Sequence, residues 1–144
     1  MDVRRSRTVA APLDDVWRIV RDPYHLPRWW PRTQRVEGVH GDGWTTVLGN
    51  ERSGRSVRAD WRLDSSRRPT RRWSQELAGT PFERLLTRHT VELEAVPDGD
   101  ATRVTLTIEQ QVRGWARLAP WMIKRAARRQ ADAALDGIEA AVAA

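Results

Sequence analysis

The feature that most constrains the fold is a change of hydrophobic period at Gly114. Before this glycine, apolar and polar residues alternate in several runs, such as that from Val57 to Leu63, and a period of two is typical of half-buried strands. After it, apolar residues recur at helical spacing from Leu118 to Val142, which predicts one long amphipathic helix. A curved antiparallel sheet has a concave apolar face, and this helix is the element able to cover it.

The segment from Val9 to Val39 predicts two short helices after the first strand. Pro12 fits the first position of a helix, where no backbone N–H is needed, and Asp22-Pro23 ends that helix. A second, shorter helix is expected around Trp29-Trp30. With about six further strands before the last helix, the order predicts an α+β fold, and the length predicts a single domain spanning residues 1–144.

Several short sequences along the whole chain carry a family resemblance. They are Ala11-Pro12 with Val16-Trp17, Asp22-Pro23, Trp29 with Pro31, Gly79-Thr80-Pro81-Phe82, Thr102-Arg103-Val104-Thr105 and the final long helix. With them the chain resembles the START-like (helix-grip, SRPBCC) superfamily, in its polyketide cyclase/dehydrase branch. The resemblance implies a curved antiparallel sheet of seven strands wrapped around the C-terminal helix, with an internal cavity for apolar ligands. Members of that superfamily bind lipids, sterols, plant hormones or aromatic polyketides, and some cyclise nascent polyketides.

The strand alternation predicts which side chains would line such a cavity. Aromatic walls with a few convergent polar groups are typical of small-molecule sites, whereas the alternative is a filled core with satisfied polar groups. The candidate cavity residues are Trp61, Trp73, Gln75, Thr87, His89, Gln110 and Met122.

His89 is the candidate catalytic residue. An imidazole titrates near neutral pH, which suits general acid–base chemistry, and Gln75 and Gln110 could orient a ligand beside it. The enzymatic interpretation is a cofactor-free cyclase, aromatase or dehydratase that acts on an aromatic or polycyclic molecule. The alternatives are a structural histidine, and a non-catalytic carrier or sensor of lipids or other small molecules.

Four further residues are expected at the cavity entrance: Trp115, Leu118, Gly79 and Gly54. The segment from Trp115 to Met122 also has the composition of a membrane-surface contact. In a START-like fold these residues would close one end of the cavity, and closure is the preferred interpretation.

The chain is basic, with a net charge of +6 and a pI of about 11.2, so nucleic acid is one candidate partner. However, Lys124 is the single lysine, and such an arginine and alanine bias is typical of GC-rich coding in bacteria. The clusters at Arg67–Arg72 and Lys124–Arg129 are therefore interpreted as solvated faces.

The remaining motifs suggest neither a metal nor a cofactor. There is no cysteine, the three histidines have no metal-binding spacing, and no glycine-rich nucleotide loop occurs. The expected partner is a hydrophobic small molecule, and a homodimer is left open. The N-terminus lacks an apolar signal region, so a cytoplasmic location is expected.

Overall fold

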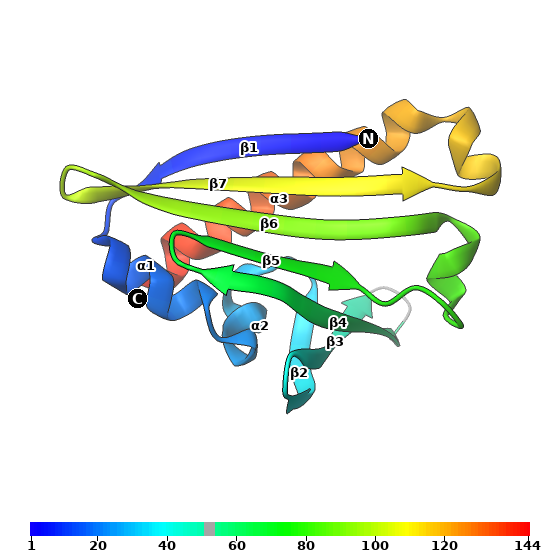
Figure 1. Ribbon diagram of the computed structural model, residues 1–144, viewed down its shortest axis with the longest axis horizontal. Coiled ribbons are helices and arrows are strands. Elements are labelled where there is room, and N and C mark those ends of the chain that lie inside the picture. The colour runs from blue at the N-terminus through cyan, green and yellow to red at the C-terminus, as the bar shows by residue number, and fades with distance from the viewer. Residues whose placement is uncertain (51–53) are drawn as a thin grey trace.

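The computed structural model describes residues 1–50 and 54–144 and contains one antiparallel sheet (Figure 1). The strands lie in the order β1-β7-β6-β5-β4-β3-β2. Their bounds are β1 Asp2–Val9, β2 Thr33–His40, β3 Gly43–Asn50, β4 Arg55–Arg67, β5 Thr70–Gln75, β6 Leu86–Asp98 and β7 Ala101–Val112. The helices are α1 Leu13–Val20, η1 Pro23–His25, α2 Leu26–Trp29, η2 Pro81–Arg84, η3 Gly114–Leu118 and α3 Pro120–Ala143.

Helix α3 runs obliquely along one face of the sheet, and α1 and α2 lie at one end of it (Figure 1). On the inner face of β6 and β7, Leu93 and Leu106 are completely buried. The facing side of α3 carries mainly alanines, together with Leu135 and Ile138. This arrangement confirms the helix-grip fold that the sequence predicted.

Small residues let α3 approach its neighbours closely. A side-chain Cβ at Gly137 would lie 2.3 Å from the carbonyl oxygen of Trp29 at the end of α2, far inside van der Waals contact. The two backbones therefore meet at a point where only glycine fits.

The outer edge of α3 is joined to β1 by ion pairs. Arg5 Nε donates to Asp132 Oδ1 at 2.8 Å, and Arg7 pairs with both Asp136 and Glu139. The hydrogen bond to Asp136 raises the pKa of Arg7. These contacts connect the first strand with the last helix, at opposite ends of the sequence.

Local patterns in the sequence also predict a turn from Ser65 to Thr70, a strand break at Gly79 and a polar connection from Gly49 to Gly54. Strand β4 instead continues to Arg67, and the short helix η2 follows the break. Of the polar connection, Gly49 and Asn50 belong to β3, and residues 51–53 lie outside the described residues. Within the described chain, no helix has both the length and the apolar character needed to cross a membrane.

Candidate functional site

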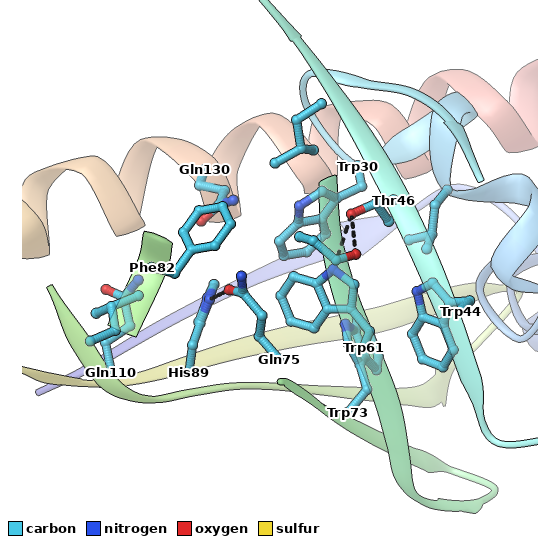
Figure 2. A pocket seen from close by; sticks show the side chains of 14 residues that line it. Trp30, Trp44, Thr46, Trp61, Trp73, Gln75, Phe82, His89, Gln110 and Gln130 are labelled. Atoms are coloured by element: carbon cyan, nitrogen blue, oxygen red, sulfur yellow. Dashed lines mark hydrogen bonds between the residues drawn. The ribbon is translucent and has the colours of Figure 1, made fainter. Parts of the chain in front are cut away.

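A cavity of about 230 Å³ lies between the sheet and α3 (Figure 2). Its walls come from β3 to β7, from the region of α2, from η2 and from α3. The lining residues are Leu26, Trp30, Trp44, Thr46, Leu48, Ala59, Trp61, Trp73, Gln75, Phe82, Leu86, His89, Gln110 and Gln130. The surface of the cavity is thus mainly apolar and aromatic, with a few amide, hydroxyl and imidazole groups.

Tryptophan rings form the largest part of the walls. Trp30 and Trp73 meet edge to face with their ring centroids 6.4 Å apart, and Trp29 packs edge-on against both from behind. The indole N–H of Trp61 donates to Thr46 Oγ1 at 3.0 Å. Edge-to-face packing and this hydrogen bond fix the ring orientations, so the shape of the cavity is set before any ligand enters.

His89 and Gln75 form a buried polar pair on neighbouring strands. His89 Nδ1 lies 2.9 Å from Gln75 Oε1 (Figure 2). The His89 and Trp61 rings pack edge to face, with their centroids 5.2 Å apart. Burial lowers the pKa of His89 from 6.5 to about 4. The imidazole is therefore neutral at neutral pH. The bond then runs either from Nδ1–H to the amide oxygen or, with the amide turned, from its NH₂ group to Nδ1.

Both members of this pair also have a polar atom without a partner. His89 Nε2 and Gln75 Nε2 are buried and make no hydrogen bond to any described residue. The indole nitrogen of Trp44, also in the cavity wall, is in the same situation. Buried polar groups in proteins are nearly always hydrogen-bonded, so these three atoms are candidate positions for hydrogen bonds with a bound molecule.

A second hollow adjoins the cavity. Gln110 and Gln130 line both spaces, so their side-chain amides mark the boundary between them. This groove of about 510 Å³ runs between α3 and the segment after α2. Arg32 and Arg129 stand along it, and neither forms an ion pair with another described residue. A ligand larger than the cavity could therefore extend past the two amides toward positive charge.

The structure brings together five of the seven residues predicted to line the cavity: Trp61, Trp73, Gln75, His89 and Gln110. Thr87 is exposed, and its hydroxyl donates to the carbonyl oxygen of Gln111. The pairing of β6 with β7 shifts between Leu86 and Arg88, so the alternation reverses and Leu86 faces the cavity instead.

Met122 is also outside the cavity. It lies in the first turn of α3 and is exposed, whereas Gln130, about two turns further along, reaches the cavity. Gln130 and Trp30 were not predicted to line the cavity. Gln130 lies among alanines and charged residues of the last helix, and Trp30 lies in the expected second short helix rather than on a strand.

The four residues expected at the entrance are all exposed, and none lines the cavity. Gly79 precedes η2, whose Phe82 does line it, and Gly54 lies just before β4. Trp115 and Leu118 belong to η3, which lies with η2 at the same end of the sheet (Figure 1). Trp115 and Leu118 are exposed and lie outside the cavity lining, so closure of the cavity by these two residues stays a prediction.

One arginine of the Arg67–Arg72 cluster is buried rather than solvated. Arg71 shares the inner face of β5 with Trp73 and Gln75, and it donates to Ser66 Oγ at 3.0 Å. Burial lowers the pKa of Arg71, and the nearby charge of Asp22 acts in the opposite direction. The cluster is thus partly a structural element beneath the helices.

Among the described residues, no group of three or more histidine and acidic side chains is placed to hold a metal ion. Within the cavity lining, His89 is the one titratable side chain. The chemistry available to the walls is therefore hydrogen bonding, aromatic contact and proton transfer at a single imidazole.

A family model described as polyketide cyclase / dehydrase and lipid transport matches residues 1–143. The chain belongs to this family. The family assignment agrees with the resemblance seen in the sequence, and with a cavity that lies under the C-terminal helix.

Solved structures share the fold of this chain. The Zhui aromatase/cyclase from Streptomyces sp. R1128 is 20% identical with a TM-score of 0.79, over 99% of this chain and 93% of that one. A START superfamily protein from Mycobacterium smegmatis is 17% identical with a TM-score of 0.78, over 99% and 97%. The protein TTHA0849 from Thermus thermophilus is 20% identical with a TM-score of 0.77, again over 99% and 97%. No curated protein matches the chain.

Proposed function

We propose that this member of the family binds a hydrophobic small molecule, built on aromatic rings, in the cavity under α3. Four tryptophans and several aliphatic side chains line the space, and such walls favour flat apolar ligands. At the packing density of a protein interior, about 0.74, the cavity suits a molecule of roughly two fused rings. A larger ligand would continue into the groove beyond Gln110 and Gln130.

The observation that carries the proposal is the pair of unpartnered polar atoms on His89 and Gln75. With Nδ1–H donating to the amide oxygen, His89 Nε2 is a hydrogen-bond acceptor and the Gln75 amide nitrogen is a donor. A ligand hydroxyl complements both, because it can donate to the imidazole and accept from the amide. The ligand is therefore proposed to carry a phenolic or enolic hydroxyl.

Exchanging the positions of the Gln75 amide oxygen and nitrogen leads to the same preferred ligand group, a hydroxyl. The Gln75 NH₂ group would then donate to Nδ1, so Nε2 would carry the hydrogen and the amide oxygen would be free to accept. Either way, the pair offers one donor and one acceptor. A ligand group that can only accept, such as an ether oxygen, would satisfy half of the pair.

A second candidate function is cofactor-free cyclisation or dehydration of such a ligand. It is supported by the family description and by the name of Zhui, an aromatase/cyclase. His89 would be the base, since its Nε2 is unprotonated at neutral pH. Its lowered pKa also makes it a weak base, and no second titratable group of the described chain lines the cavity to donate a proton. Binding is therefore the stronger proposal.

Two measurements test the binding proposal. Native mass spectrometry of the purified protein should detect a co-purifying aromatic compound. Calorimetric titration should show that 2-naphthol binds roughly tenfold more tightly than 2-methylnaphthalene, which has almost the same size but leaves both polar atoms unpaired. Non-specific hydrophobic binding would give the opposite order, because the methyl compound is the more apolar.

Substitutions within the pair sharpen this test. His89→Phe and Gln75→Leu should each weaken the binding of 2-naphthol while retaining that of 2-methylnaphthalene. Gln111→Leu, at an exposed glutamine on β7, is the control that should change neither. Equal affinities of the two probes for the unmodified protein would rule out hydroxyl recognition, and binding of neither probe would rule out the aromatic site itself.

A further inference from the structure

Four large apolar side chains are exposed close together in sequence at the start of the C-terminal region. Trp115, Leu118, Trp121 and Met122 are 68%, 86%, 65% and 52% exposed. They belong to η3 and to the first turn of α3, which extend beyond the end of β7 (Figure 1). None of them lines the cavity, so their apolar surface is not used by the proposed ligand site. Exposed apolar surface of this extent marks an interaction site in many proteins.

The charged residues along this segment are all basic. From Gln110 to Ala131 the sequence contains no aspartate or glutamate, but it contains six basic residues. Arg113, Arg117, Lys124 and Arg125 flank the apolar side chains, and none of the four forms an ion pair with another described residue. In contrast, the acidic residues further along α3 pair with arginines of β1.

We propose that the segment 113–125, here called the basic apolar tip, docks onto an anionic lipid surface. Tryptophan side chains favour the boundary between headgroups and hydrocarbon. Basic residues beside them are attracted to the negative surface of an anionic bilayer. The tip has both features on one short segment, as interfacial helices do. This surface is separate from the cavity, and its function does not depend on which ligand the cavity binds.

A second copy of the chain fits the tip less well than a lipid surface does. In a symmetric dimer the same patch faces itself, so the unpaired cations of the two copies would oppose one another. An anionic bilayer instead supplies the missing negative charge over a wide area and accepts the tryptophan rings. Charge complementarity therefore selects the lipid surface as the occupant.

The tip is connected to the part of the structure that borders the cavity. The backbone N–H of Arg113 donates to the carbonyl oxygen of Leu85 at 2.8 Å, directly after η2. Phe82 in η2 lines the cavity. Docking through the tip would thus bring η2 close to the bilayer, where a hydrophobic ligand is most concentrated.

Vesicle co-sedimentation of the full chain tests the proposal. The protein should bind vesicles of equimolar phosphatidylcholine and phosphatidylglycerol, bind phosphatidylcholine vesicles far more weakly, and dissociate at high salt. The double variant Trp115→Ser with Trp121→Ser should weaken binding by more than about tenfold, because it removes both rings. Arg117→Glu with Lys124→Glu should do the same by reversing two charges.

Matched controls distinguish an effect of the basic apolar tip from an effect of net charge or of exposed aromatic side chains in general. Arg4→Glu with Arg103→Glu changes the net charge equally at exposed positions outside the tip, and Tyr24→Ser removes an exposed ring elsewhere. Both controls should retain nearly all of the vesicle binding. Equal loss in the controls, or no preference for anionic vesicles, would overturn the proposal. So would a dimer in light scattering that Trp115→Ser with Trp121→Ser converts to a monomer.

Discussion

At the scale of single residues, His89 shows how its surroundings set its chemistry. The imidazole lies between Gln75, which fixes Nδ1, and the ring of Trp61. Among the described residues, no charged side chain lines the cavity to stabilise a protonated imidazole, and desolvation lowers the pKa of His89. The result is a neutral hydrogen-bonding group that can receive a ligand at Nε2.

The lowered pKa of His89 makes stability depend on pH in a defined direction. The folded protein protonates His89 near pH 4, whereas the unfolded chain does so near 6.5. As the pH falls through this window, the unfolded state gains a proton first, so the free energy of unfolding decreases. The contribution of neutral His89 to stability is fully present above the pKa of the unfolded chain. Between pH 7 and pH 5 the contribution of His89 should fall by about 2 kcal/mol. Urea unfolding at both pH values measures this change.

His89→Phe supplies the reference for this prediction. The variant keeps a ring in the same place but cannot be protonated there, so its free energy of unfolding should depend less on pH by that amount. Groups elsewhere in the chain contribute equally to both proteins and cancel in the comparison. An identical pH dependence in the two proteins would contradict the assigned pKa.

Thr87 shows where residue-level prediction from the sequence stops. Alternation placed it on the same face as His89, and the rule is correct from His89 to Ala95, where every second residue is buried. One extra residue in β6 at the bulge reverses the rule before His89. The sequence has no local signal for this bulge, since Leu85-Leu86-Thr87 alternates acceptably in either register.

At the scale of elements, α3 depends on small residues where it meets the rest of the fold. Ala127, Ala131 and Ala134 are buried on its inner side, and Gly137 faces the end of α2. These small side chains let the helix lie close to its neighbours. Gln130, in the same stretch of α3, reaches the lining of the cavity.

Gly137→Ala should destabilise the protein although alanine favours helices. The added Cβ would lie within 3 Å of three backbone atoms of Trp29, so α3 and α2 must separate. Overpacking of this kind costs about 1–3 kcal/mol, more than the gain of about 1 kcal/mol in helix propensity. Chemical denaturation should show a lower midpoint.

Ala126→Gly is the control for Gly137→Ala: it makes the reverse substitution at an exposed position of the same helix. It should also destabilise, by about 1 kcal/mol, because propensity alone acts there. Glycine would then be preferred at 137 and alanine at 126. A stabilised Gly137→Ala protein would show that the α2–α3 contact is looser than the structure indicates.

At the scale of the whole molecule, the order of strands and main helices followed from long periodic patterns in the sequence, and the helix-grip fold followed from the family resemblance. The cavity lining followed in part, since inward faces of strands are periodic as well. Its remaining walls depend on tertiary placement: Trp30 comes from the helical pair, Phe82 from a short helix and Gln130 from α3. Distances between elements are not encoded in local periodicity, so these residues could not be assigned in advance.

Because the cavity lies between the two layers, ligand binding should stabilise the entire fold. At 2-naphthol concentrations of about 100 times the dissociation constant, the gain is about 2.7 kcal/mol. For a chain of this size that corresponds to a rise of roughly 5–10 °C in the unfolding midpoint. Differential scanning calorimetry measures it, with 2-methylnaphthalene at the same concentration expected to give a smaller rise. An unchanged midpoint at a concentration that saturates binding would contradict the proposed location between the layers.

The pairing of β1 with β7 also has a consequence for biosynthesis. Val3 lies opposite Ile108, so β1 lacks its partner strand until more than a hundred further residues have been made. At roughly 5–20 residues per second, this delay is on the order of ten seconds. During that time β1 is an unpaired strand, and its charged residues Asp2, Arg4, Arg5 and Arg7 would discourage association with other nascent chains. The two arginines that later hold α3 in place thus also help to protect the chain while it is still being synthesised.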